Sequence, residues 1–412
     1  MRWVFLLLVW PLGFTADVRS QMKPLLPQHI TVANDALGSP GIDAGDYVYV
    51  SGQGPRRPDG STPSNFPGQV RQSLDNVKAV VEAAGLTMDH VVYVQVYLDD
   101  MNGYEPLNAA FAEYFAKTPP ARGVLGVARL PEPPVQITAV AVRDLKGKQP
   151  VNPANFKPSK AYSAGMLTHD RLFVSTMLGS DPSNGNVPDN AAAQVDLALD
   201  RLKTLAAAAG LTLSNMVFVN PYLTSAIPMR IMNEHYARRF EFGNTPGRAT
   251  IEVSSLPEGA HIAYTGVAVR DLAQRHAIRP KNMPPSPTAS PCVFAGDTLY
   301  CSAKSGFIPG PNGGVFAAST ADQVRQTMRN QLDNLEEAGM KFDQVVSTTI
   351  YLDDLSESAA FGKVYRKYFS GVLPAQTTVQ QLQATERKPD EEGNYPDLEQ
   401  VSLIAVRGPA NH

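Results

Sequence analysis

The stretch at residues 120–145, PARGVLGVARLPEPPVQITAVAVRDL, decides the fold. It begins with a Pro-Ala-Arg turn and continues as two apolar segments separated by a proline-rich turn, a pattern that predicts two strands. It returns as PGRATIEVSSLPEGAHIAYTGVAVRDL at residues 246–272. It returns again, less well preserved, between Pro374 (PAQTTVQQLQ) and Arg407 (VSLIAVR). A stretch that recurs in this way indicates a chain built from repeats.

Further elements recur around this stretch in the same order. Each repeat opens with a hairpin around a Gly-Asp or His-Asp turn, followed by a helix with apolar residues three and four positions apart. An apolar strand and a second helix complete the repeat. The first helix ends each time at a glycine, as a C-terminal cap does: Gly85, Gly210 and Gly339. Within the second repeat, Pro221 argues that the strand at residues 216–223 is interrupted or lies at a sheet edge.

Each repeat is therefore predicted to be an α+β domain with the order β-β-α-β-α-β-β. We expect a signal peptide at residues 1–20 and domains at 21–147, 148–275 and 276–412, the last degenerate. Both faces of each predicted sheet are apolar, and the two helices cover only one of them. Three domains packed around a pseudo-threefold axis would bury the other, so we expect an intramolecular pseudo-trimer.

The beginning of the chain has the pattern of a secretory signal peptide. Arg2 precedes the apolar run WVFLLLVWPLGF, and Val18 and Ser20 provide apolar and small residues for cleavage after Ser20. The expected location is therefore secreted or periplasmic, with no membrane segment in the mature protein; an uncleaved anchor is the alternative. Cys292 and Cys301 fall opposite each other in one predicted hairpin, where a disulfide and two buried free thiols are both compatible with the sequence.

Composition excludes several classes of function. The net charge of −3 gives no general attraction to nucleic acid, and the seven scattered histidines predict no metal site. Asp99-Asp100 and Asp353-Asp354 could be paired catalytic carboxylates, but both pairs are good N-caps for the following helix, which is the interpretation we favour. Neither a P-loop nor a nucleophilic triad is present in the sequence.

Arg122 and Arg248 carry the strongest functional signal. A proline fixes the backbone just before each arginine and a strand begins just after it, so each guanidinium is rigidly directed and suited to pair with a carboxylate. The alternative is a structural arginine that ties domains together. The third repeat has Gln376 at this position.

Taken together, these features resemble the RidA (YjgF/YER057c/UK114) family of reactive intermediate deaminases, three times over. The resemblance rests on SGQ at Ser51, on AAGL at the end of the first helix, on NAAFAEYF at residues 108–115, and on PAR followed by RLP and AVAVR. It implies a chorismate-mutase-like α+β fold and clefts between subunits, with one chain supplying all three subunits of the family's homotrimer. It also implies hydrolysis of 2-aminoacrylate-type enamines and imines to 2-oxo acids and ammonium, without a cofactor.

The resemblance also implies site residues. Arg122 and Arg248 would grip the substrate carboxylate, whereas Gln376 would not. The family's last-strand glutamate is matched to Thr138, Thr265 and Ser402, so Thr138 and Thr265 are the residues expected to orient water, and Ser402 marks the degenerate copy. A threonine hydroxyl does not take up a proton at neutral pH. The residues expected to shape the substrate pockets are Ser51, Gly52, Tyr162, Ser163, Ser175 and Glu252.

Four functions remain open at this point. The first is a divergent deaminase of 2-iminocarboxylates acting through Arg122 and Arg248. The second is a non-catalytic binder of small carboxylates, which the missing glutamate favours. An endoribonuclease ranks lower because the chain is net acidic. A structural or partner-binding scaffold is the fourth.

Overall fold

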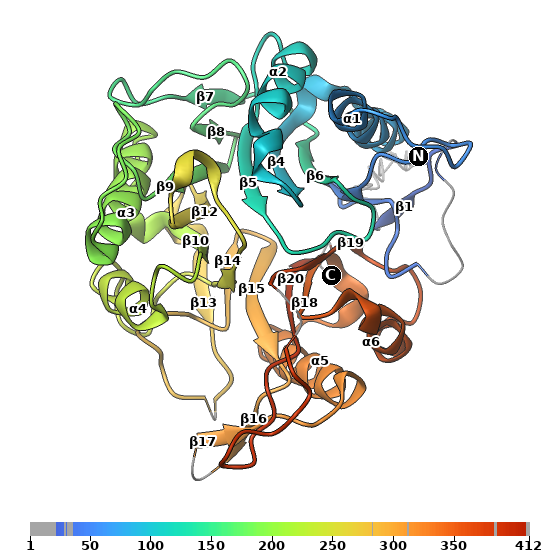
Figure 1. Cartoon of the computed structure of the whole chain (residues 1–412), viewed down its shortest axis with the longest axis vertical. Coiled ribbons are helices and arrows are strands. Elements are labelled where there is room, and N and C mark those ends of the chain that lie inside the picture. The colour runs from blue at the N-terminus through green and yellow to red at the C-terminus, as the bar shows by residue number, and fades with distance from the viewer. Residues whose placement is uncertain are drawn as a thin grey trace, which may run out of the picture.

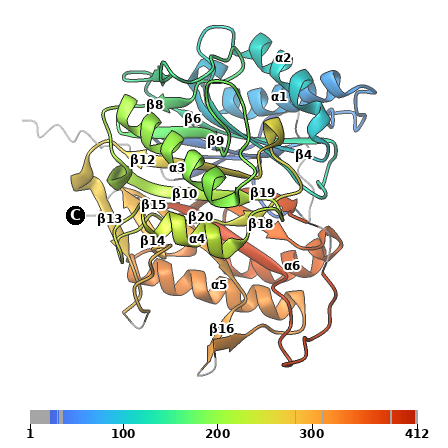
Figure 2. The ribbon, with the colours of Figure 1, turned by 60° about the vertical axis from the view of Figure 1, so that its left-hand side comes forward.

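The computed structural model describes residues 22–28, 30, 36–281, 283–310, 313–382 and 385–408. The predicted signal peptide lies outside these residues. Within them, the chain forms three α+β domains arranged around a common centre, with the helices outside and the strands inside (Figure 1). The turned view in Figure 2 shows the same outer position for α3, α4 and α5. Among the described residues, no helix is long and apolar enough to cross a membrane.

The three domains are built from the same elements. The first contains β1 (Lys23–Leu25), β2 (Gly41–Asp43), β3 (Tyr47–Gln53), α1 (Phe66–Ala83), β4 (Val91–Leu98), α2 (Tyr104–Tyr114), β5 (Ala121–Gly126) and β6 (Val135–Val142). The second contains β7 (Gln149–Val151), β8 (Gly165–Leu167), β9 (Arg171–Leu178), α3 (Ala191–Ala208), β10 (Met216–Leu223), α4 (Met229–Ala237), β11 (Ile251–Glu252) and β12 (Ile262–Val269). The third contains β13 (Arg275–Ile278), β14 (Cys292–Ala295), β15 (Thr298–Ser305), α5 (Thr320–Glu337), β18 (Val345–Leu352), α6 (Ser358–Tyr365), β19 (Ala375–Gln380) and β20 (Glu399–Val406), with a small hairpin of β16 (Ile308–Gly310) and β17 (Gly313–Val315).

All three sheets share one strand order. In the first domain it is β1-β2-β3-β6-β4-β5, and the corresponding order recurs in the other two. The expected elements are present, and each sheet gains a short edge strand, β1, β7 or β13. The last two lie at or next to the predicted domain boundaries, at residues 149–151 and 275–278. Arg275, the last residue of the predicted second domain, begins β13 of the third sheet. Strands of three or four residues are too short for a clear alternation of apolar residues.

The first helix of each domain shows why these segments fold as they do. In α1, Asn65 caps the N-terminus by accepting a hydrogen bond from the Gly68 amide, and Pro67 lies in the first turn, where its missing N–H costs nothing. Val70, Leu74, Val77 and Val81 form its buried face. Gly85 follows with a φ of 73°, a left-handed conformation that glycine adopts without strain. The helix thus covers the outer face of its sheet.

Pro221 neither interrupts its strand nor places it at a sheet edge, so this prediction was wrong. β10 is an unbroken strand between β11 and β12, not an edge strand. Pairing with β11 begins only at Tyr222, one residue after the proline. Next to Pro221, the Asn220 side chain accepts a hydrogen bond from the Ala249 amide in place of a backbone partner. The missing N–H of proline is therefore accommodated by a gap in one ladder.

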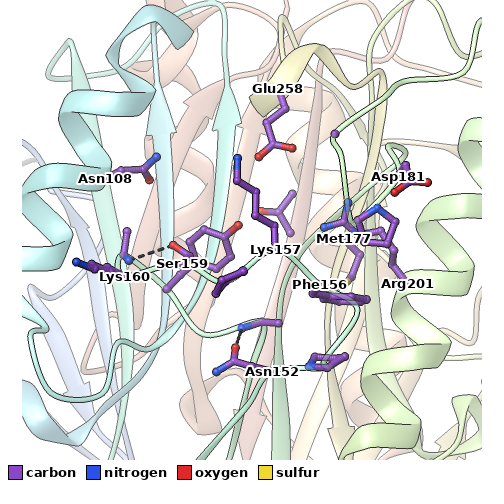
Figure 3. A pocket seen from close by; sticks show the side chains of 18 of the residues that line it. Asn108, Asn152, Phe156, Lys157, Ser159, Lys160, Met177, Asp181, Arg201 and Glu258 are labelled. Carbon is purple, nitrogen blue, oxygen red and sulfur yellow. Dashed lines mark hydrogen bonds between the residues drawn. The ribbon is translucent and has the colours of Figure 1, made fainter.

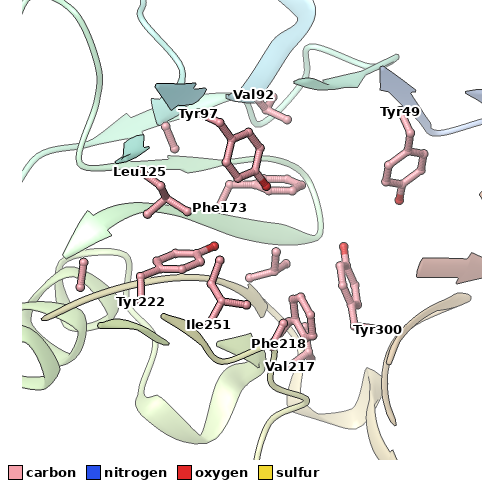
Figure 4. Close-up of a cluster of buried hydrophobic side chains, with 14 of the residues drawn as sticks. Tyr49, Val92, Tyr97, Leu125, Phe173, Val217, Phe218, Tyr222, Ile251 and Tyr300 are labelled. Atoms are coloured by element: carbon pink, nitrogen blue, oxygen red, sulfur yellow. The ribbon is translucent and has the colours of Figure 1, made fainter. Parts of the chain in front are cut away.

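The inner faces of the three sheets meet in one apolar cluster at the centre of the molecule (Figure 4). Its members include Tyr97 and Leu125 from the first domain, Phe173 from the second and Tyr300 from the third. A cavity of about 120 Å³ lies within it, lined by side chains from all three sheets. The face that a single domain would leave wet is therefore covered by the other two domains.

Arg171 lies where the three domains meet, and its side chain is only 2% exposed. Its guanidinium donates to the Tyr300 hydroxyl and the Thr298 hydroxyl of the third domain, each at 2.9 Å. It also pairs with Asp170 at 3.0 Å and lies 4.4 Å from the centre of the Tyr47 ring of the first domain. One buried cation thus joins all three domains.

The third domain departs most from the common pattern. Cys292 and Cys301, opposite each other in β14 and β15, are joined by a disulfide with a Cα–Cα distance of 4.0 Å. Its last strand begins with Glu399, which is fully buried and accepts a hydrogen bond from the Thr327 hydroxyl. Burial raises the pKa of Glu399 well above its usual range, and it raises the pKa of the nearby Asp397 to about 7.

Asp397→Asn is expected to change how stability depends on pH. The folded state holds a proton on Asp397 up to about pH 7, whereas the unfolded chain loses it near 3.8. The wild-type free energy of unfolding therefore falls as the pH rises through this window. The variant should be more stable than wild type by about 1–3 kcal/mol at pH 8 and about equal at pH 4, in urea titrations. Asp333→Asn, at an exposed position of α5, is the control; equal pH profiles for wild type and Asp397→Asn would contradict the expectation.

Candidate functional site

In each domain, a serine hydroxyl accepts a hydrogen bond from the backbone amide of a neighbouring domain's residue at the start of a strand. The Arg122 amide donates to Ser175 Oγ of the second domain at 2.6 Å, and the Arg248 amide donates to Ser302 Oγ of the third at 2.8 Å. The Gln376 amide donates to Ser51 Oγ of the first domain at 2.7 Å, which closes the ring. Three equivalent clefts result. We call them the 1–2, 2–3 and 3–1 clefts after the domains on either side.

In the 1–2 cleft the guanidinium of Arg122 is enclosed by aromatic rings. Its central carbon lies 4.7 Å from the centre of the Phe111 ring, 5.0 Å from Tyr162 and 5.7 Å from Tyr104. One nitrogen donates to Asn108 Oδ1, while Nε and Nη1 have no hydrogen-bond partner. Burial lowers the pKa of Arg122, and the nearby tyrosines partly offset this. A buried guanidinium with two unpaired nitrogens is suited to an anionic ligand.

A cavity of about 700 Å³ lies next to this arginine (Figure 3). Tyr104, Asn108 and Tyr162 belong to its wall, but Arg122 does not. Ser163 and Ser175 do not line the cavity, and the Ser175 hydroxyl donates a hydrogen bond to the Ser163 carbonyl at 2.6 Å. Arg122 is therefore next to the cavity through Tyr104, Asn108 and Tyr162 and is not itself part of the wall.

Several charged residues line the same cavity, among them Glu258 and Arg201, and the sequence did not single them out. Glu258 is the one non-glycine residue of the described part with a positive φ, 58°, and its carboxylate points into the cavity (Figure 3). Arg201 stacks on Phe156 at 5.2 Å and donates to the Ser180 carbonyl at 3.2 Å. The sequence Leu-Pro-Glu occurs in two repeats, so Glu258 could have been recognised as the residue equivalent to Glu132.

The 2–3 cleft is smaller, and its arginine is accessible. Arg248 lines a cavity of about 310 Å³, lies 5.3 Å from the Tyr236 ring and donates to Asn233 Oδ1 at 2.8 Å. Thr250 Oγ1, also in the wall, is buried without a partner. Among the described lining residues there are two cations, Arg248 and Lys304, and no Asp or Glu. This cleft is suited to an anion.

The 3–1 cleft has lost the cationic group. Gln376 donates its side-chain N–H to Thr378 Oγ1, and Arg56 at the mouth is paired with Glu132 at 2.8 Å. Gly362 occupies the helix position that carries asparagine in the other two domains. A side chain there would meet Leu37 at 2.5 Å, so the asparagine cannot return without a shift. The cavity of about 710 Å³ is lined by Ser51 and Gly52.

The structure corrects the position of three residues. Thr138, Thr265 and Ser402 line the central cavity and not the clefts. Each of these three side chains lies on the inner face of its strand. In β6 and β20, the residue two positions earlier lies on the same face, about 7 Å away along the strand, and lines a cleft. There Gln136 lines the 3–1 cavity and Gln400 the 2–3 cavity. The three hydroxyl residues therefore do not orient water beside Arg122 or Arg248.

Other predicted residues are placed as follows. Glu252 is exposed on β11 and lines none of the three cleft cavities. Asp100 and Asp354 accept hydrogen bonds from backbone amides two residues on, as capping residues do, each at 2.9 Å. In the described residues, no group of three or more His, Cys, Asp or Glu is placed to hold a metal ion.

The fold and the clefts together define a class of protein: repeated α+β domains with an arginine at two of the three seams. Comparison with known proteins agrees. The family model described as Endoribonuclease L-PSP matches residues 33–143, 153–269 and 282–388, which is most of the chain. The chain belongs to this family, the RidA/YjgF proteins, as a tandem repeat of three members.

Two relatives and one solved structure illustrate the similarity. The 2-iminobutanoate/2-iminopropanoate deaminase of Escherichia coli K12 is 44% identical over 108 residues, 25% of this chain and 84% of that protein. A RutC family protein of Haemophilus influenzae is 41% identical over 108 residues, 25% of this chain and 83% of that protein. The crystal structure of E. coli TdcF with bound serine is 35% identical and covers 30% of this chain and 99% of that chain, with a TM-score of 0.29.

Proposed function

We propose that this chain is a divergent deaminase that hydrolyses reactive 2-iminocarboxylates to 2-oxo acids and ammonium in its 1–2 and 2–3 clefts. The observation that carries the proposal is the repeated geometry of Arg122 and Arg248, each anchored by a serine from the next domain and each beside a cavity. The name of the E. coli relative, a 2-iminobutanoate/2-iminopropanoate deaminase, supports the substrate class.

The side chains suggest how the chemistry would proceed. The guanidinium pairs with the substrate carboxylate and fixes the neighbouring imine carbon in the cavity. In the 1–2 cleft, Glu258 can accept a proton from the water that attacks this carbon. Loss of ammonia from the resulting carbinolamine gives the 2-oxo acid. Reactive imines need less help than stable amides, so the absence of a last-strand glutamate is compatible with turnover.

We further propose that the three domains of one chain replace a homotrimer of single-domain subunits. Hydrogen bonds across all three seams support this assembly. An exported protein is consistent with the sequence of residues 1–20 and with the Cys292–Cys301 disulfide. The relevant imines would then arise outside the cytoplasm.

A non-catalytic binder of small carboxylates is the second candidate. It is favoured by the 2–3 cavity, in which no described lining residue is a carboxylate that could act as a base. An endoribonuclease finds less support, because the net charge is −3 and the described lining of each large cleft has as many Asp and Glu residues as Lys and Arg residues.

The two candidates are separated by a coupled assay in which an amino-acid oxidase generates the imine. The wild-type protein is expected to accelerate loss of the imine, and Arg122→Ala combined with Arg248→Ala should reduce the rate by about 10–100-fold, as loss of a charge-assisted contact does. Gln376→Ala is the matched control and should leave the rate unchanged. Binding of 2-oxo acids in calorimetry without turnover would favour the binder.

A further inference from the structure

Lys304 lies at a position that carries a different side chain in each of the three domains. It follows a β-bulge in β15, and the equivalent residues after the same bulge are Gln53 in β3 and Met177 in β9. Each of these side chains lines the cavity at the corresponding seam. A bulge changes the direction of a side chain, and here it turns all three toward the clefts. Only the third repeat places an amine there.

The surroundings of this amine are unusual for lysine. The Lys304 side chain is partly buried, and its amine makes no hydrogen bond or ion pair with any residue that the structure describes. Arg248 lies in the same wall, and the Ala303 amide beside Lys304 donates to the Arg248 carbonyl at 3.0 Å. The described lining residues include no carboxylate that would pair with the lysine. An unpaired amine is thus held beside the group that grips carboxylates.

We propose that Lys304 is a nucleophile that forms a covalent Schiff base with 2-imino and 2-oxo acids whose carboxylate is held by Arg248. This inference rests on the proposed function, since it names how the 2–3 cleft works without a carboxylate base. A lysine amine attacks imine and carbonyl carbons when it is uncharged. Burial lowers the pKa of the Lys304 ammonium, which increases the fraction of free amine.

The reaction balances without any other reactant. The amine adds to the C=N carbon of the 2-imino acid, and the resulting gem-diamine expels ammonia, which carries away the substrate nitrogen. The product is an imine between Lys304 and the acid. Water then adds to this imine, and breaking the bond to the lysine nitrogen releases the 2-oxo acid and restores the amine. The net change is the same hydrolysis, and a 2-oxo acid alone forms the same protein-bound imine with loss of water.

The intermediate can be trapped without any measurement of turnover. The full mature chain is incubated with pyruvate and cyanoborohydride, which reduces the imine to a stable secondary amine, and the labelled peptide is found by mass spectrometry. We expect one dominant label, on Lys304. Lys304→Arg keeps the charge but cannot form the imine, and should lose this label while Lys157 and Lys160, which line the 1–2 cavity, keep their low background.

A second set of measurements tests whether labelling requires a carboxylate held by Arg248. Acetone, which lacks the carboxylate, should label Lys304 at least tenfold less than pyruvate, and an excess of propionate should protect it. Arg248→Ala should reduce labelling similarly, and the acetone and propionate measurements keep the test valid if that variant folds poorly. Labelling of Lys304 no greater than of Lys157, or labelling that ignores propionate, would overturn the proposal. Specific labelling without imine turnover would retain the Schiff base and reject the deaminase.

Discussion

Replacing Arg171 with leucine is expected to destabilise the folded chain by about 3–5 kcal/mol, because the change breaks a buried charge network by removing one partner. Arg171 is 2% exposed and donates to Tyr300 and Thr298 of the third domain while pairing with Asp170. Leucine would leave the buried Tyr300 and Thr298 hydroxyls without this donor and would remove the cation beside Asp170. The loss should appear in guanidinium titrations as an earlier unfolding midpoint.

The matched control is Arg143→Leu. Arg143 pairs with Asp43 at 2.8 Å within the first domain, but its side chain is 42% exposed. Solvent-exposed pairs contribute about 0–1 kcal/mol, so this variant should unfold close to wild type. A cost for Arg171→Leu as small as that of Arg143→Leu would show that the junction of the three domains does not depend on the cation.

Arg248→Ala is expected to weaken propionate binding in the 2–3 cleft by about 10–100-fold, which corresponds to about 1.5–3 kcal/mol for a hydrogen bond to a charged group. The reason is access, since Arg248 lies in the wall of its cavity. Arg122→Ala should cost less propionate affinity, because Tyr104 and Tyr162 separate that guanidinium from the 1–2 cavity. Calorimetry with propionate measures both.

Tyr104→Ala provides a check on this interpretation. It should open the path to Arg122 and add a second propionate site, which disappears again in the Tyr104→Ala, Arg122→Ala double variant. Gln376→Ala should leave all propionate titrations unchanged. Equal losses from Arg122→Ala and Arg248→Ala in the presence of Tyr104 would contradict the difference in access.

Much of this fold could be predicted because the same signals occur three times. The spacing of Val70, Leu74 and Val77 gives the buried face of α1, and the Pro-x-Arg turns gave the positions of Arg122 and Arg248 at the seams. Ser175, which the sequence suggested would shape a pocket, lies at the 1–2 seam and accepts a hydrogen bond from the Arg122 amide, but it is not among the residues that line the cavity. Repetition made each of these weak local patterns specific.

The misplaced residues have a common physical cause. Alternation along a strand shows which sheet face a residue occupies, but it does not show how far along the strand a cleft ends. Thr138 and Gln136 share a face, and only Gln136 reaches a cleft. Likewise, Glu258 depends on a left-handed backbone conformation and Lys304 on a β-bulge. The sequence repeats the Leu-Pro-Glu turn but does not show the left-handed conformation, and it gives no signal for the bulge.

The hydrogen bond between Ser51 and the Gln376 amide joins positions 325 residues apart. A ribosome that adds about 5–20 residues per second needs roughly 15–65 s to cover that interval. Until then the inner surface of the earliest domain lacks its last neighbour, so newly made chains depend on being shielded from one another. Truncation before Gln376 should consequently yield aggregates and not a smaller stable protein.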